Sequence, residues 1–185
     1  NFSFAGAAPV SGSYRAHGLE NALTIAYAGE TISVDLAMPG AHNARNALAA
    51  AAVAFAAGIA ASAVRAGLSA FRGIKGRLQR RPAKNGALLL DDTYNANPDS
   101  VRAGIDVLAA TVGKKILVLG DMGEIGEMTA QFHDEIGGYA KSQGIDRLFA
   151  FGESAALAAL NFGAGGQHFK KIETLIEALV AELNP

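Results

Sequence analysis

The sequence contains no cysteine, only four histidines and no long basic or acidic run. Without thiols the chain can form neither a disulfide framework nor a thiolate zinc site. The formal net charge is −1, which argues against a surface that binds nucleic acid through phosphate contacts. No signal-peptide pattern is visible in these residues, and no uncharged apolar stretch of about 18 residues predicts a membrane span.

A chain of 185 residues is long enough for one domain or one and a half, and half of its residues are apolar, which is enough to form a core. We expect residues 1–18 to be mainly loop with at most a short strand. Two strand-like runs, 21–28 and 31–38, are separated by Gly29-Glu30 and predict a hairpin. Two helices should follow, at 44–57 and about 60–70.

The N-terminus of the first of these helices has two candidate caps, Asn43 and His42. After a junction at 72–77 the pattern alternates between short apolar strands and amphipathic helices. The strands are expected at 86–91, 115–119, 146–151 and 167–170, and the helices at 98–110, 128–143, 153–162 and 172–183. This order predicts the α/β class, with a Rossmann-like, mostly parallel sheet covered by helices on both faces. The hairpin and its helices would precede that domain.

The segment LLLDDTYNANPDSV at 88–101 is the most informative stretch. An apolar run ends at Asp91 and Asp92, a polar loop follows, and Pro98 opens a helix for which Asn97 is the expected N-cap. The carboxylates therefore lie at the C-terminal end of a strand, which is where open α/β sheets bind ligands. An arbitrary pair of aspartates is more often a solvated turn.

Four stretches, in the same order along the chain, resemble motifs of the Mur ligase family. They are GAHNARNALAAA at 40–51, GRLQR at 76–80, DDTYNANPDS at 91–100 and VLGDMGEIG at 118–126. These motifs are most similar to those of the Mur ligase that adds D-Ala-D-Ala to UDP-MurNAc-tripeptide. That ligase acts through an acyl phosphate in bacterial cytoplasmic peptidoglycan precursor synthesis.

The resemblance implies that residues 1–75 are the end of the central ATP-binding domain. Residues 76–185 would be most of the C-terminal domain, without its last strand and helix. ATP and Mg²⁺ are implied as cofactors, held mostly by parts outside this sequence, and a monomer is expected. The chain has no G-x-x-x-x-G-K-[ST] phosphate loop, so we expect the 185 residues alone to be inactive.

The family pattern also assigns roles to single residues. It places Asn46 against the adenine of ATP and counts Asn43 in the same nucleotide-binding set, where it holds the loop before the helix. Arg77 would lie near the nucleotide phosphates or base, because a guanidinium recognises phosphate in a planar, bidentate way. Asp92 would accept the ribose hydroxyls. On the same loop, Tyr94 would stack on the base and Asn95 would bond it or shape the loop.

The glycine-rich stretch 120–126 is spaced G-x-x-G-x-x-G, which does not fit a dinucleotide fingerprint. It is either a plain connection or a substrate-facing loop in which Asp121 and Glu124 meet the ammonium of the incoming dipeptide. His133, one turn into the next helix, could point back at this edge, although a lone helical histidine is more often structural. No residues are assigned to a metal.

Three alternatives stay open at this point. The chain could belong to the ligase that adds the third residue of the peptide, or to a folylpolyglutamate synthetase-like enzyme, since both share the architecture. It could also be a non-catalytic Rossmann-like module that holds a nucleotide or a protein. A serine hydrolase is disfavoured, because no G-x-S-x-G occurs.

Overall fold

The computed structural model describes residues 1–6 and 8–183. The chain folds as two compact units, residues 1–74 and residues 75–185. The first unit contains one sheet in the order β1-β2-β3-β4. Its elements are Phe2–Ser3 (β1), Val10–His17 (β2), Glu20–Tyr27 (β3), Glu30–Leu36 (β4), Ala41–Ala56 (α1) and Ala61–Ala70 (α2). Strands β2, β3 and β4 form an antiparallel meander, and β1 runs parallel to β2.

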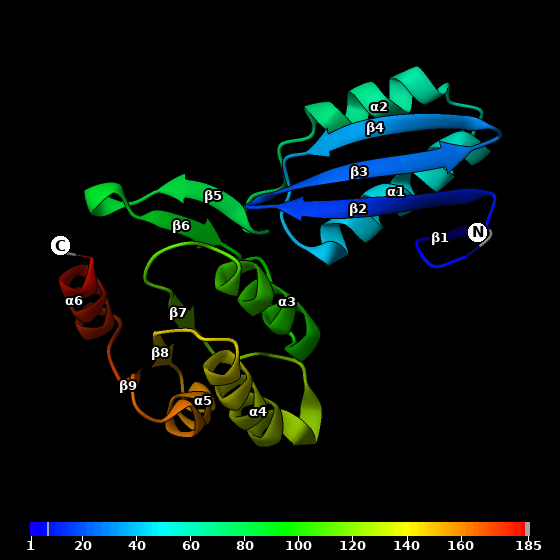
Figure 1. Ribbon diagram of the computed structural model, residues 1–185. Helices are drawn as coiled ribbons and strands as arrows, with labels where there is room; N and C mark the ends of the chain where they lie inside the picture. The colour runs from blue at the N-terminus through cyan, green and yellow to red at the C-terminus, as the bar shows by residue number, and fades with distance from the viewer. Residues whose placement is uncertain (7, 184–185) are drawn as a thin grey trace. The chain divides into compact units, whose positions relative to one another are not determined.

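The core of the first unit forms where both helices pack along the sheet (Figure 1). Strand β3 alternates, so that Leu23 and Ile25 are almost fully buried and contact the apolar face of α1. The alternation has the period of a half-buried strand. It confirms the hairpin expected at 21–28 and 31–38, with β3 and β4 paired from Asn21↔Leu36 to Tyr27↔Glu30.

The prediction that residues 1–18 are mainly loop was wrong, because β2 is an eight-residue strand fully paired with β3. The small residue Gly12 in this strand allows close packing and does not indicate a loop. A Cβ on Gly12 would lie 2.6 Å from the carbonyl oxygen of Thr24 and 3.2 Å from a methyl carbon of Leu48. Pairing with β3, across the turn at Gly18-Leu19, thus makes a strand from a segment with weak local preference.

The second unit contains a hairpin and a separate parallel sheet. The hairpin consists of Gln79–Pro82 (β5), the 3-10 turn Lys84–Gly86 (η1) and Leu88–Asp91 (β6). The parallel sheet has the order β7-β8-β9, with strands Ile116–Leu119, Arg147–Phe151 and Gly166–Phe169. The helical elements are Pro98–Ala109 (α3), Gly126–Met128 (η2), Thr129–Ser142 (α4), Ala155–Phe162 (α5) and Ile172–Glu182 (α6).

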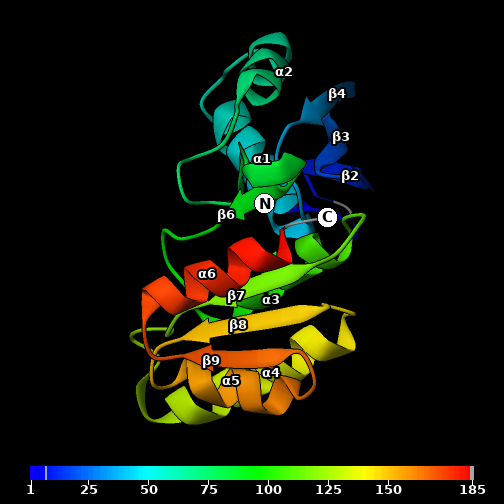
Figure 2. The ribbon, with the colours of Figure 1, turned by 90° about the vertical axis from the view of Figure 1, so that its left-hand side faces the viewer.

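Helices cover both faces of this parallel sheet, as Figure 2 shows, with α6 on one face and α4 and α5 on the other. Along β8, Leu148 and Ala150 face the core shared with α4 and α5, while Phe149 faces Phe169 and Leu175 of α6. A strand buried on both faces explains why β8 has a continuous apolar sequence. The α/β class and the alternation predicted after the junction are confirmed.

One part of the expected sheet differs. The strand predicted at 86–91 was placed in the parallel sheet, but among the described residues β6 pairs only with β5, antiparallel, from Gln79↔Asp91 to Pro82↔Leu88. The reason is the short reversal between them, closed by a hydrogen bond of 2.9 Å from the Ala83 N–H to the Ala87 carbonyl. A connection of this length joins antiparallel strands. Strand β5 itself was not predicted.

Helices α4 and α5 touch at Gly137, which allows their backbones to approach closely. A Cβ at Gly137 would lie 2.0 Å from the carbonyl oxygen of Ala158, a collision with rigid backbone. The adjacent Gly138 differs, because a Cβ there would meet only the side-chain amide of Asn161, at 3.1 Å. The two neighbouring glycines therefore test close packing separately from helix propensity.

We expect Gly137→Ala to destabilise the fold by about 1–3 kcal/mol or more, because the added methyl forces the two helices apart. Gly138→Ala is the matched control. It should cost much less or even stabilise, since alanine gains about 0.5–1 kcal/mol over glycine in a helix interior. Urea unfolding of both variants measures the difference, and equal free energies of unfolding would contradict the packing argument.

Asp91 anchors the hairpin to the loop that follows it. Its Oδ1 accepts from the Thr93 hydroxyl at 2.7 Å and from the Thr93 N–H at 3.3 Å, and its Oδ2 lies 3.2 Å from an Arg81 nitrogen. The hydroxyl bond from Thr93 is the main reason that the pKa of Asp91 lies below its ordinary value of 3.8, with Arg81 adding to it and burial acting in opposition.

A carboxylate with a lowered folded-state pKa contributes stability above its unfolded pKa and loses it as the pH falls through the folded-state value. We therefore expect Asp91→Asn to lower the free energy of unfolding at pH 7. Its difference from the wild type should shrink as the pH drops below about 4. Asp35→Asn, at an exposed strand position, is the control and should change little at any pH. A difference for Asp91→Asn that is constant with pH would refute the assignment.

Candidate functional site

The loop that leads into α1 is held by two asparagine amides. The Asn21 Nδ2 donates to the carbonyls of Met38 and Gly40, at 2.7 and 3.0 Å, and the Asn43 Nδ2 donates to Pro39 at 2.7 Å. Three consecutive carbonyls are thus fixed. Asn21 is 1% exposed and was not singled out in the sequence. The sequence did contain one indication of its burial, because Asn21 stands two residues before Leu23 and so falls on the buried face of β3.

Helix α1 begins three residues earlier than predicted, at Ala41. Within the described chain Gly40 is its N-cap, with φ 87°, and no side chain caps the helix. The expected cap by Asn43 or His42 was therefore wrong, because Asn43 already donates to Pro39 from inside the first turn. Asn46 lies exposed on the second turn. Its adenine role stays a prediction.

In the second unit, the hairpin pairing continues past the ends of its strands. The register Gln79↔Asp91 brings Leu78 opposite Asp92, and the Leu78 N–H donates to the Asp92 Oδ1 at 3.0 Å. One step further, the Tyr94 N–H donates to the Gly76 carbonyl at 3.0 Å. The GRL segment and the DDTY loop therefore lie side by side.

This approach requires unusual backbone. Gly76 has φ 72°, and a Cβ there would lie 3.0 Å from the Tyr94 nitrogen, so glycine suits the position. Leu78 has φ 47°, which is rare for a residue with a branched side chain. Strained backbone of this kind persists only where the surrounding structure enforces it, and it is frequent at ligand sites.

The arrangement places three predicted site residues together. The Arg77 guanidinium carbon lies 4.4 Å from the centre of the Tyr94 ring, which is 66% exposed, and Asp92 lies half-buried at the strand end beside them. A stacked guanidinium and phenol offer a flat surface for an aromatic base. A carboxylate can accept from ligand hydroxyls. The cluster of Arg77, Asp92 and Tyr94 is called the nucleoside edge below.

The rest of the DDTYNANPDS loop divides between exposed and structural residues. Asn95 is exposed on the same loop as Tyr94. Asn97 is the N-cap of α3, as predicted, with a capping box in which it and Ser100 bond each other's backbone N–H at 2.9 and 3.0 Å. The helix start therefore fixes where the loop ends.

The glycine-rich loop after β7 is anchored by His133, which is fully buried. The Nε2 of His133 accepts from the Met122 N–H at 2.9 Å, and its Nδ1 lies 2.7 Å from the Thr129 carbonyl. A carbonyl can only accept, so Nδ1 carries the proton. The predicted contact of His133 with substrate does not fit the structure, because the side chain is fully buried and both ring nitrogens are hydrogen-bonded within the protein. His133 instead holds the loop.

Asp121 and Glu124 lie on the outer side of this loop. Both are exposed, and Glu124 has φ 59°. The Oδ1 of Asp121 accepts from the Ala155 N–H at 2.7 Å, at the start of α5. A carboxylate at a helix N-terminus is favourable. The contact of both acidic residues with an ammonium stays a prediction.

Two other kinds of feature are absent from residues 1–6 and 8–183. There, His, Asp and Glu do not gather in groups of three or more that could hold a metal ion. In the same residues, no helix combines the length and apolar character that a membrane crossing needs.

The chain is similar to known proteins over most of its length. It is 39% identical over 163 residues to the UDP-N-acetylmuramoyl-tripeptide–D-alanyl-D-alanine ligase of Escherichia coli (strain K12), covering 88% of this chain and 35% of the relative. It thus spans about a third of that protein.

Solved structures agree with this relationship. The crystal structure of MurF from Acinetobacter baumannii superposes with a TM-score of 0.88 at 31% identity, over 98% of this chain and 40% of that one. The fold is also shared with the MurF ligase of Thermotoga maritima in complex with ADP, with a TM-score of 0.74 at 22% identity, over 98% of this chain and 48% of that one.

A family model described as the Mur ligase, glutamate ligase domain matches residues 76–185. That range is nearly the whole second unit, with the hairpin, the parallel sheet and the loops that follow its strands. The chain therefore belongs to the Mur ligase family, whose members are ligases of peptidoglycan synthesis.

Proposed function

We propose that this chain is part of an ATP-dependent ligase that joins D-Ala-D-Ala to UDP-MurNAc-tripeptide in bacterial cytoplasmic peptidoglycan precursor synthesis. The observation that carries the proposal is the nucleoside edge, where Arg77 stacks on Tyr94 beside the carboxylate of Asp92. The name of the E. coli relative supports the choice of substrates.

The residues of the nucleoside edge fit a nucleoside triphosphate. Tyr94 is exposed enough to stack on a base, and the planar guanidinium of Arg77 can face base or phosphate. Asp92 lies at a strand end, where it can accept ribose hydroxyls while it also holds the Leu78 N–H. In the first unit, Asn46 is the exposed amide proposed to contact the adenine.

ATP, with Mg²⁺ bound by parts outside these residues, would supply the phosphoryl group that turns the tripeptide carboxylate, a poor electrophile, into an acyl phosphate. The chain's own residues would bind and align. Asp121 and Glu124 carry the negative charge suited to the ammonium of the dipeptide, and His133 keeps their loop in place. Alignment of the amine is worth much of the barrier in such a reaction.

Two kinds of alternative are weaker. A ligase for the third peptide residue or a folylpolyglutamate synthetase-like enzyme would share the fold, but the DDTYNANPDS and GDMGEIG wording favours the D-Ala-D-Ala type. A non-catalytic nucleotide-binding module would use the nucleoside edge alone. Turnover that depends on D-Ala-D-Ala distinguishes the proposed ligase both from the related ligases and from a binding module.

We expect a full-length ligase that carries this chain to release phosphate from ATP only when both UDP-MurNAc-tripeptide and D-Ala-D-Ala are present. The 185-residue chain alone should release none, because it contains no phosphate loop. Phosphate release with a single amino acid in place of the dipeptide would favour another ligase. Nucleotide binding without any turnover by the full-length protein would favour the binding module.

We expect Asp92→Asn in the same full-length ligase to raise the KM for ATP by roughly tenfold, the cost of a hydrogen bond to a charged group. The amide oxygen of the variant can still accept from the Leu78 N–H, so the hairpin should stay folded. Asp99→Asn, an exposed aspartate from the same stretch, is the matched control. An unchanged KM for ATP in Asp92→Asn would remove Asp92 from the ribose role.

A further inference from the structure

Gly152, just past the end of β8, lies between two side chains that come from the neighbouring strand ends. A Cβ at Gly152 would lie 2.3 Å from the Asp121 Oδ1, and φ at this residue is 119°. On its other side, the Nε2 of His168 lies 2.9 Å from the Gly152 carbonyl oxygen. Only glycine accommodates both the backbone conformation and the adjacent carboxylate.

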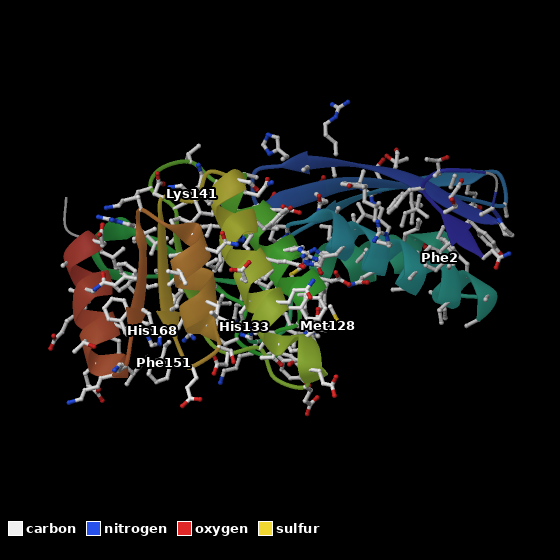
Figure 3. The ribbon with its side chains drawn as sticks, turned by 90° about the horizontal axis from the view of Figure 1, so that it is seen from below. Phe2, Met128, His133, Lys141, Phe151 and His168 are labelled. Carbon is white, nitrogen blue, oxygen red and sulfur yellow. The ribbon has the colours of Figure 1, made fainter. Side chains whose placement is uncertain are left out.

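The three residues come from three consecutive strand ends of the parallel sheet. Asp121 follows β7, Gly152 follows β8 and His168 is the third of the four residues of β9. In Figure 3, His168 and Phe151 lie at one end of these strands and Lys141 at the other. This is the carboxyl edge of the sheet, where ligands of open α/β folds bind.

The hydrogen bond from His168 has one direction. A carbonyl oxygen can only accept, so the Nε2 of His168 is the donor, whether or not Nδ1 carries a second proton. The bond fixes the peptide that follows Gly152, and that peptide leads directly into α5. The N–H of Ala155, three residues on, donates to the Asp121 Oδ1 at 2.7 Å.

These contacts form one chain of restraints from His168 to Asp121. The start of α5 holds the Asp121 Oδ1 next to Gly152. The orientation of the carboxylate therefore depends on the position of the Gly152 turn. A shift of that turn would rotate or displace the carboxylate. Asp121 is the residue proposed above to meet an ammonium, so its placement matters for the incoming amine.

We propose that His168 is a positioning residue for the acceptor amine, holding the Gly152 turn so that Asp121 faces the ammonium of a short peptide. This rests on the proposed function and adds a residue that no sequence motif indicated. His168 is exposed, while the packing of β9 is carried by the buried Phe169. Loss of the imidazole should therefore affect alignment more than stability.

The test uses a full-length ligase that carries this chain, with steady-state kinetics for each substrate. His168→Leu should raise the KM for D-Ala-D-Ala by roughly fivefold, the worth of one neutral hydrogen bond, with the KM values for ATP and the tripeptide unchanged. His168→Gln, whose amide can donate over a similar reach, should recover most of the loss. Gln167→Leu, at the preceding exposed position of β9, is the matched control and should behave as wild type.

His168→Asn gives an independent variant, since its side chain is polar but too short to reach the Gly152 carbonyl. It should reproduce the selective rise in the KM for D-Ala-D-Ala even if the leucine variant does not fold. An unchanged KM for the dipeptide, an equal rise for all three substrates, or no recovery in His168→Gln would each overturn the positioning role. A wild-type enzyme with no D-Ala-D-Ala-dependent phosphate release would instead overturn the proposed function, and this inference with it.

Discussion

The hydrogen bond from the Leu78 N–H to the carboxylate of Asp92 is the contact on which the nucleoside edge depends. It extends the β5–β6 pairing beyond its last ladder residues and draws the GRL segment against the loop after β6. Together with the bond from the Tyr94 N–H to the Gly76 carbonyl, it holds the segment that places Arg77 over Tyr94 and that contains the positive φ of Leu78. The Asp92 Oδ1 accepts from the Leu78 backbone, and its Oδ2 would lie 3.4 Å from a Cβ built on Gly104 of α3, so Asp92 has a structural role, while its ligand role stays a prediction.

The loops at the carboxyl edge of the parallel sheet follow the same logic. His133 from α4 pins the Met122 peptide, and Asp121 is pinned by the start of α5. The loop that carries the exposed Asp121 and Glu124 is therefore held in place by the buried His133 and by the start of α5. A site built in this way loses little conformational entropy when a ligand binds.

Much of the fold could be predicted from the sequence where the signal is local. Asn97 and Pro98 mark the start of α3 because capping chemistry depends on neighbouring residues only. The alternation of β3 and the continuous apolar run of β8 likewise reflect burial that each segment needs wherever it is placed. Strand β2 was not predicted, because its small residues show no periodic alternation in the sequence. The reason for a glycine at position 12 is visible only in the structure, where it packs closely against Thr24 and Leu48. Strand β5 was missed because its sequence, QRRP, is polar and acquires its conformation only from pairing with β6.

By itself, the sequence determined the order of strands and α-helices from β6 onward, the capping of α3 and the polar loops that follow the apolar strands. These features arise from residues close together in the chain, whose preferences do not need a partner. Tertiary structure alone decided that Asn21 secures the loop before α1, that His133 is internal, and that His168 reaches the Gly152 carbonyl. Each of these contacts joins residues 11 to 19 positions apart. Hydrogen-bond partners at such separations are selected by packing, because many polar groups compete for each donor until the surrounding core fixes which of them come within reach.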